Sequence, residues 1–377
     1  MKPDTSSYGG ALRDWVAAEL CDLYRRPAPQ GGGLLMGGLM YGDAYVSRFL
    51  SWTAKTIQAD FDALKGRARI VLFTDAGGFD KLWQYARRME FSGIPTQVFI
   101  VPGRILDGLE EGNKRTRNLS RYKLLGAVQN LLTQIAGRYG CGFHALFPDM
   151  IYSAGYFGRL LKLAETHKGI AHSNISAGVE VIGEVAQYSR NGMLAIPALD
   201  LGDMAFRHMH KRSRGNLMNR GREWLGFPAS HCLIWQAKDR LRQFCCHSNA
   251  TYIAPEWCAK ATVRYFSPID CNLPYLLDDF YTPRLEDGMA MMEVSDDTYP
   301  ASNSRVSAEK FAAICWYHVQ DRDDYLPYFA TPNDIPIRDQ REYLDLAEID
   351  ARQADIHAGI IALKDEVKGR FIVKEAA

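Results

Sequence analysis

The 377-residue sequence has no long hydrophobic run, and none of its apolar stretches approaches the roughly 18–20 residues that a membrane-spanning helix needs. Its first ten residues also lack the apolar core of a secretory signal peptide. Neither sign of charge is in excess, because 45 Lys and Arg stand against 44 Asp and Glu. A dedicated nucleic-acid binder usually has a strong basic excess. We therefore expect no membrane span and no nucleic-acid partner.

Cysteine is too sparse and too irregularly spaced for a disulfide framework, with eight in the whole chain. Reduced thiols predict a cytoplasmic location. Basic clusters at 114–121 and 207–222 leave peripheral contact with the inner membrane face open. The run Cys245-Cys246-His247 with Cys258 offers four soft ligands, but adjacent cysteines rarely direct both thiolates at one metal. The spacing therefore does not predict a structural zinc site.

The common catalytic signatures are missing as well. The glycines at 31–33 and 37–38 form neither a G-x-G-x-x-G turn after a strand nor a phosphate-binding P-loop. There is no G-x-S-x-G elbow and no H-E-x-x-H helix. The prediction of function therefore depends on the order of secondary-structure elements and on the residues at strand ends.

An alternation of strands and helices occupies residues 69–165. The apolar run 69–74 stops at Asp75 and two glycines, as a buried parallel strand does where its loop faces a ligand crevice. The later segments predict strands at 96–101 and 143–147 and helices at 79–88, 118–138 and 151–165. This order is typical of an α/β protein with a parallel sheet covered by helices.

The remaining segments complete the predicted organisation. Helical spacing appears at 11–24, 41–64 and 178–190, whereas short strands at 233–235, 252–253 and 289–294 follow in an irregular, aromatic-rich second half. A polar loop at 295–305 and helices at 307–318 and 338–374 end the chain. We expect an N-terminal helical extension (1–40), an α/β part (41–200), a second part of the same domain (201–335) and a C-terminal helix (336–377).

Asp149 and two histidines are the strongest candidates for chemistry. Asp149 follows the apolar run at 143–147, where a carboxylate can hold a metal on a diphosphate or bond a ribose hydroxyl, or can cap the following helix. His208 and His210 lie two residues apart and share a face if the segment is extended. With Asp149 they are candidates for a metal site, or one of them, His210 before His208, is a catalytic residue that acts on a phosphate or hydroxyl. The alternative is a pair of partly exposed histidines in a basic loop.

Three stretches resemble bacterial glycosyltransferases of the GT-A type, which have a nucleotide-sugar-binding α/β domain. The first is 41–46, followed by the run RIVLFTD at 69–75. The second is 119–123, leading through a helix to FHALFPDMIYSAG at 143–155. The third is 208–210 after 195–201. The resemblance covers residues 40–300, and it implies that 41–200 is the nucleotide-binding part and 201–335 the acceptor and catalytic part.

This resemblance implies a GT-A-like, Rossmann-type mixed sheet and an enzyme that moves a sugar from a nucleotide-sugar donor to a hydroxyl acceptor. It implies that Thr74 and Asp75 lie near the base or ribose, and that Arg121, Tyr122 and Lys123 pass beside the nucleotide. Asp149 takes the place of the acidic Asp-x-Asp motif on a metal–diphosphate. Since only one carboxylate is present, Mg²⁺ or Mn²⁺ would need other ligands such as His210.

The remaining roles stay open at this stage. Basic residues of the predicted site are an alternative to a metal for stabilising the leaving diphosphate. Glu256 is a candidate general base for the acceptor, alongside Asp270, Asp296 and Asp297. Two other functions fit the same pattern: a metal-dependent phosphate-ester or nucleotide hydrolase using Asp149 and the histidines, and a non-catalytic scaffold that docks through the C-terminal helix.

Overall fold

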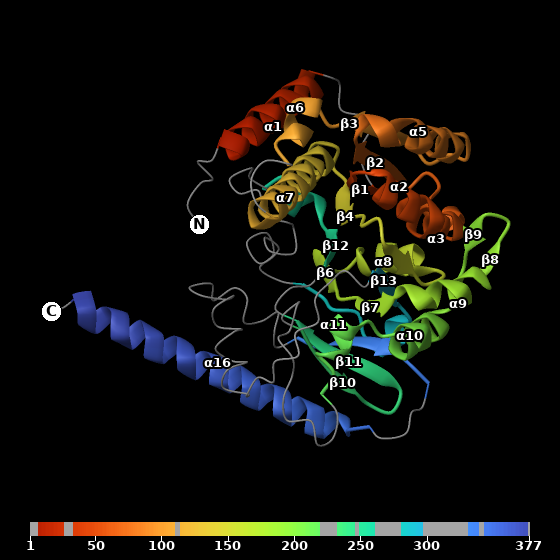
Figure 1. Cartoon of the computed structure of the whole chain (residues 1–377). Helices are drawn as coiled ribbons and strands as arrows, with labels where there is room; N and C mark the ends of the chain where they lie inside the picture. Colours follow the sequence, from red (N-terminus) through yellow and green to blue (C-terminus); the bar gives the residue numbers. More distant parts are fainter. Residues whose placement is uncertain are drawn as a thin grey trace. The chain divides into compact units, whose positions relative to one another are not determined.

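The computed structural model describes residues 7–25, 33–109, 114–218, 232–245, 249–260, 280–296, 331–338 and 343–375. The chain forms two compact units that interleave along the sequence. The first comprises residues 1–171, 189–195 and 249–281, and the second comprises 172–188, 196–248 and 282–377. Each is described by itself (Figure 1).

The first unit is built around a six-stranded sheet with the order β3-β2-β1-β4-β12-β6. Its strands are β1 (Leu34–Met40), β2 (Ala68–Thr74), β3 (Thr96–Ile100), β4 (Gly142–Ala145), β6 (Gly169–His172) and β12 (Asn249–Ile253). The pairs β1–β2, β2–β3 and β1–β4 are parallel, and β12 runs antiparallel to β4. The predicted α/β class, a parallel-rich mixed sheet flanked by helices, is confirmed.

Helices cover both faces of this sheet. The chain runs from β1 to β2 and then to β3 in one direction across the sheet, and α5 connects β2 with β3. The connection from β3 to β4, which contains α7, crosses the sheet in the opposite direction. Because both connections are right-handed, α5 and α7 lie on opposite faces. The helices of this unit are α1 (Ser7–Arg25), α2 (Asp43–Arg48), α3 (Ala54–Ala59), α4 (Phe61–Leu64), α5 (Ala76–Phe91), α6 (Gly103–Asp107), α7 (Lys114–Arg138), α8 (Tyr156–Leu163) and α12 (Pro255–Cys258), with a π-helical turn at Phe49–Thr53. The short strands β5 (Met150–Tyr152), β8 (Ser189–Arg190) and β9 (Met193–Leu194) complete it.

Strand β1 is the main difference from the sequence prediction, which has no strand at 34–40. Its sequence, LLMGGLM, contains two glycines that read as chain breakers. In the fold they are required, because a Cβ on Gly37 would lie 2.7 Å from the Leu132 side chain of α7. A Cβ on Gly38 would lie 2.1 Å from the carbonyl oxygen of Leu146. Glycine in a strand often marks such a close approach of another element.

Three predicted helices have different bounds. The helix predicted at 151–165 begins only at Tyr156, because residues 150–152 form β5. The helix predicted at 178–190 is a short 3₁₀ turn (Val179–Val181), then α9 (Ile182–Ala186) and then β8. The C-terminal helix, α16, spans Leu346–Glu375 rather than starting at 338. The helix predicted at 307–318 and most of the polar loop at 295–305 lie outside the described residues.

The second unit contains a parallel pair and an antiparallel sheet. Strand β7 (Ile175–Gly178) pairs with β13 (Met291–Ser295), and α10 (Ala198–Arg207) packs against both. Strands β10 (Cys232–Gln236), β11 (Arg240–Cys245) and β14 (Asn333–Pro336) form the antiparallel sheet. Ile349 of α16 belongs to a buried cluster that includes Trp235 and Phe244 of this sheet. Ile356 and Leu363, which follow Ile349 at seven-residue intervals, pack against the same cluster. A short helix α11 (Lys211–Arg214) and a 3₁₀ turn at Leu285–Asp287 also belong to this unit.

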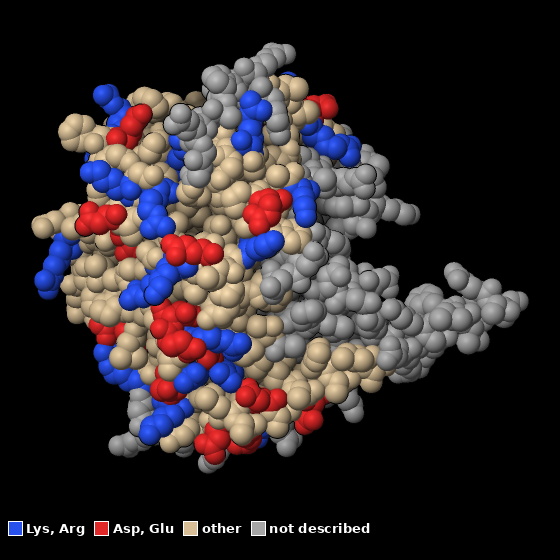
Figure 2. All heavy atoms as spheres, turned by 180° about the vertical axis from the view of Figure 1, so that it is seen from behind, with Lys and Arg blue, Asp and Glu red and all other residues tan. Residues whose placement is uncertain are grey.

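Charged side chains are mixed over the surface. On the face shown in Figure 2, acidic and basic side chains of the described residues alternate without a continuous basic band. In the described part of the chain, no helix combines the length and apolar character needed to cross a membrane.

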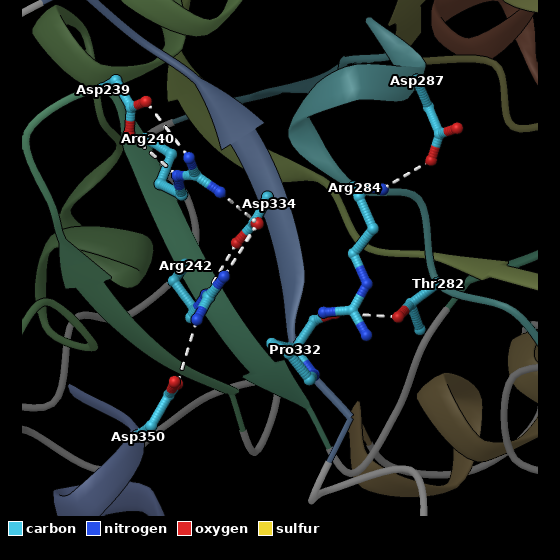
Figure 3. A network of polar contacts seen from close by, with 9 residues as sticks. All are labelled: Asp239, Arg240, Arg242, Thr282, Arg284, Asp287, Pro332, Asp334 and Asp350. Carbon is cyan, nitrogen blue, oxygen red and sulfur yellow. Dashed lines mark hydrogen bonds and ion pairs between the residues drawn. The ribbon is translucent and has the colours of Figure 1, made fainter. Parts of the chain in front are cut away.

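Buried charge is concentrated in the second unit, where Asp334 accepts hydrogen bonds from Arg240 and Arg242 (Figure 3).

Candidate ligand site at the ends of the parallel strands

The strand order reverses between β1 and β4. From β1 the chain proceeds outward to β2 and β3, and β4 then lies on the other side of β1. In open parallel sheets, ligands bind beside the carboxyl ends of the strands at such a reversal. The loops that leave β1 and β4 at this point are residues 41–42 and 146–149. They define the candidate site.

Asp149 occupies the turn between β4 and β5, immediately after the reversal point. Its alternative role as a helix cap is wrong, because Gly155 in a left-handed conformation precedes α8 instead. The side chain is half-buried. Burial first, and then the neighbouring Tyr156 and Asp149, raise the pKa of Tyr152. The Asp149 carboxylate is therefore near enough to the Tyr152 side chain of β5 to raise the pKa of its phenol.

Thr53 holds this turn in place. Its hydroxyl oxygen lies 2.7 Å from the carbonyl oxygen of Met150 and 3.0 and 3.1 Å from those of Phe147 and Pro148. A hydroxyl has one proton, so it donates to one carbonyl at a time and the shortest contact is to Met150. Thr53 is fully buried at the end of the π-helical turn. Such turns are frequent at functional sites.

Replacing Thr53 by valine keeps the side-chain shape and removes the donor. We expect a loss of about 1–2 kcal/mol in the free energy of unfolding, because a buried carbonyl loses its partner. We also expect faster hydrogen exchange of the amides of Phe147, Asp149 and Met150. A matched control is Thr133→Val, since Thr133 is equally buried and donates to Gln129 within α7. Unchanged exchange in the turn of the Thr53 variant would contradict this role.

Thr74 and Asp75 tie the end of β2 to the end of β1. The Thr74 hydroxyl donates to the Met40 carbonyl at 2.7 Å. The Asp75 carboxylate accepts from the backbone N–H of Gly78 at 2.8 Å, capping α5, and from that of Gly42 at 2.5 Å. Both residues thus lie at the carboxyl edge of the sheet, as predicted for strand-end residues. Their contact with a nucleotide remains a prediction.

Arg121, Tyr122 and Lys123 lie in the N-terminal half of α7. Because α7 follows β3 and leads into the start of β4, this half of the helix is directed toward the carboxyl edge of the parallel strands. Arg121 and Tyr122 are exposed and Lys123 is partly exposed. Basic side chains in this position favour an anionic ligand.

The two histidines belong to the second unit and differ in their surroundings. The carbonyl of His208 accepts from Gly178, and the N–H of His210 donates to Ser176, so the segment runs beside β7. The His208 ring is 2.7 Å from Glu184, which also accepts from Arg207 at 2.6 Å. Hydrogen bonds from His208 first and then Arg207 lower the pKa of Glu184. The His208 ring therefore contacts a carboxylate near the surface, whereas His210 is buried.

The geometry gives the predicted metal site no support. Within the described ranges, no group of three or more His, Cys, Asp or Glu side chains is arranged to hold a metal ion. The set Asp149, His208 and His210 therefore stays a sequence prediction. Cys258 is buried, and burial is the main cause that raises the pKa of its thiol. Cys246 and His247 lie outside the described residues.

Glu256 lies in the first turn of α12 in the first unit. Its carboxylate is 3.6 Å from the Lys168 ammonium, and both side chains are largely exposed. Asp296 directly follows β13 in the second unit. Asp270 and Asp297 lie outside the described residues. Of the two candidate bases that the structure describes, Glu256 belongs to the unit that contains the reversal point.

Sequence reasoning missed two carboxylates that organise the structure. Asp60 accepts from the N–H groups of Gly155 at 2.6 Å and Phe157 at 2.7 Å, which fixes the start of α8. Glu293 on β13 accepts from Asn174, Ser176 and Ser295. Most of these partners lie about a hundred residues away in sequence, so no local pattern signals them.

Comparisons with known proteins give only weak likenesses. No family model matches the sequence, and no curated protein matches it. Among solved structures, mouse xyloside xylosyltransferase 1 matches at 12% identity and TM-score 0.25, over 42% of this chain and 57% of that one. S. aureus TarS 1-349 matches at 9% identity and TM-score 0.28, over 87% and 70%. The WbbM bifunctional glycosyltransferase matches at 10% identity and TM-score 0.32, over 81% and 52%. The chain thus spans little more than half the length of the first and third of these proteins, and the functional argument comes from the site.

Proposed function

We propose that this protein is a glycosyltransferase that moves a sugar from a nucleotide-sugar donor to a hydroxyl acceptor. The observation that carries the proposal is the reversal point of the parallel sheet, with Asp149 leaving β4 and Asp75 joining the ends of β1 and β2. A site of this kind suits a nucleotide, whose ribose hydroxyls bond to carboxylates at strand ends. The basic residues of α7 supply the positive charge that a diphosphate requires.

The chemistry follows from the charges that must be stabilised. When the bond between the anomeric carbon and the phosphate oxygen breaks, the nucleoside diphosphate leaves with the electron pair. A single carboxylate binds a divalent cation poorly, and among the described residues no group of three or more His, Cys, Asp or Glu is arranged to hold one. In this proposal Arg121 and Lys123 therefore meet the developing negative charge. The acceptor oxygen bonds to the anomeric carbon, and its proton passes to a general base, for which Glu256 is the candidate.

Nucleotide binding is the first measurement. The purified protein is screened by thermal shift and then by calorimetry against UDP, GDP, ADP and dTDP and the corresponding nucleotide sugars. A ligand at one hundred times its Kd should stabilise the fold by about 2.7 kcal/mol and raise the melting temperature by several degrees. Asp149→Asn should weaken binding by about tenfold or more, because a charged hydrogen-bond partner is lost.

Glu165→Gln is the matched control. Glu165 is also a carboxylate of the first unit, but it is exposed and pairs with Arg67 at the amino edge of the parallel strands. Its replacement should leave nucleotide affinity unchanged. Absence of any shift with all nucleotides would overturn the proposal. Release of sugar phosphate, nucleoside monophosphate or inorganic phosphate, with no transfer of sugar to any hydroxyl acceptor, would identify the alternative phosphate-ester or nucleotide hydrolase, because water then attacks phosphorus rather than the anomeric carbon.

A further inference from the structure

We infer that the N-terminal helix α1 contributes to the ligand site, with the Tyr8 hydroxyl donating a hydrogen bond to an acceptor atom of the nucleoside. This inference rests on the proposed nucleotide-dependent function and extends it to a helix that precedes the sheet. It assigns the nucleoside end of the ligand to α1 and the loop after β1, and the phosphate end to α7.

The Tyr8 hydroxyl oxygen is buried and has no hydrogen-bond partner among the described residues. Buried hydroxyl groups are nearly always paired, because an unpaired one loses its bond to water without replacement. Burial first, and then the neighbouring Tyr41, raise the pKa of the Tyr8 phenol. The group therefore keeps its proton and is available as a donor at neutral pH.

The surroundings of Tyr8 place it at the carboxyl edge of the parallel strands. Its ring lies on Gly108, where an added Cβ would be 2.5 Å from the ring carbon Cδ2, and Gly108 ends α6 after β3. Tyr41, which is close enough to act on the Tyr8 phenol, directly follows β1. The connections that follow β1 and β3 therefore both approach the Tyr8 side chain.

Helix α1 is held rigidly enough to present the group. Trp15 is almost fully buried and makes an edge-to-face contact with Phe73 of β2, with ring centroids 6.0 Å apart. Figure 1 shows α1 beside α6 and α7, and the helix contacts both. A donor on such an anchored helix is preorganised for a ligand.

The chemistry at this end of the site favours the nucleoside over the phosphates. Tyr8 and Tyr41 supply aromatic surface and neutral hydroxyl groups, which suit a flat base with carbonyl or ring-nitrogen acceptors. The cationic residues Arg121 and Lys123 are on α7. A neutral donor at one end and cations at the other match the two ends of a nucleoside diphosphate.

The test is Tyr8→Phe, which removes only the hydroxyl. Without ligand, its melting temperature should equal or exceed that of the wild type, because an unpaired buried polar group is lost. Its affinity for the nucleoside diphosphate that binds the wild type best should fall roughly tenfold, as expected for a hydrogen bond lost in the bound state. Its affinity for inorganic pyrophosphate should not change.

Tyr85→Phe is the matched control. Tyr85 on α5 also has a buried hydroxyl without a hydrogen-bond partner among the described residues, but its ring packs edge-to-face on Phe49 in the core. This variant should keep its melting temperature and its full nucleotide affinity. The pair therefore separates a ligand contact from the general effect of deleting a buried hydroxyl.

Each other outcome overturns the inference in a distinguishable way. Equal affinity of wild type and Tyr8→Phe overturns the inference and leaves the proposed function standing. A lower melting temperature with unchanged affinity makes the hydroxyl a structural group. A parallel loss of pyrophosphate binding overturns the assignment to the nucleoside. If the wild type binds no nucleotide at all, the proposed function fails and this inference fails with it.

Discussion

Replacing Asp334 by asparagine is expected to lower the free energy of unfolding by about 3–5 kcal/mol, because it leaves buried positive charge without its partner. The Asp334 side chain is 1% exposed and lies on β14. Its carboxylate accepts two hydrogen bonds from Arg242, at 2.8 and 3.0 Å, and one from Arg240, at 2.9 Å (Figure 3). Paired, two-pronged contacts of this kind are the strongest that arginine makes.

Asp239→Asn is the internal control for this prediction. Asp239 pairs with the same Arg240, but its side chain is 52% exposed. Exposed pairs contribute about 0–1 kcal/mol, so this variant should differ little from the wild type in urea-induced unfolding. Similar losses in both variants would show that burial of the Asp334 network does not govern the stability of the second unit.

The same arginine also joins the sheet to the C-terminal helix. Arg242 contacts Asp350 of α16 at 2.9 Å in addition to Asp334. When the Asp334→Asn substitution removes the negative charge, the Arg242 guanidinium keeps only the exposed Asp350 as a charged partner. The first turns of α16 should therefore exchange their amide hydrogens faster. Hydrogen exchange of α16 therefore gives a second, local measure of the same substitution.

The sequence pattern predicts an element well where a single segment carries the whole signal. Strand β2 is a continuous apolar run, and α7 has an apolar stripe at helical spacing, so both are read from neighbouring residues alone. Strand β1 is missed because its glycines are placed for contacts with α7 and the chain after β4. Those contacts exist only after folding. The strand predicted at 252–253 is found as part of β12, but its antiparallel pairing with β4, more than a hundred residues earlier, is not predicted, because that contact too exists only after folding.

The residues of the candidate site also fall into two groups, those that a local sequence pattern predicts and those that depend on contacts formed only in the fold. Asp75 and Asp149 are found because the end of a buried strand is a local feature that points to a ligand crevice. Thr53 and Asp60 are not found, because each acts on residues about ninety-five positions away. Tyr8 is not found from the sequence either, because what singles it out is a buried hydroxyl that has no hydrogen-bond partner among the described residues.

Acid is expected to destabilise the protein through His172, which ends β6 and is fully buried. Burial lowers the pKa of His172 from 6.5 to about 3. The folded protein therefore holds this ring neutral at pH values where the unfolded chain protonates it. The unfolded state binds more protons between pH 6.5 and 3, so stability is fully present above pH 6.5 and is lost as the pH falls through this window. Between pH 7 and pH 4 the loss is about 3 kcal/mol.

The comparison of wild type with His172→Gln isolates this contribution. The variant should be less stable at pH 7, because a buried ring is removed, but its stability should fall less steeply, so that the two urea-unfolding curves converge toward pH 4. The control is Phe157→Leu, a fully buried and non-titrating position, which should lower stability by a similar amount at every pH. If the curves of wild type and His172→Gln stay parallel, the folded protein accepts a proton on His172 as readily as the unfolded chain does. In that case another buried group sets the acid limit of the fold.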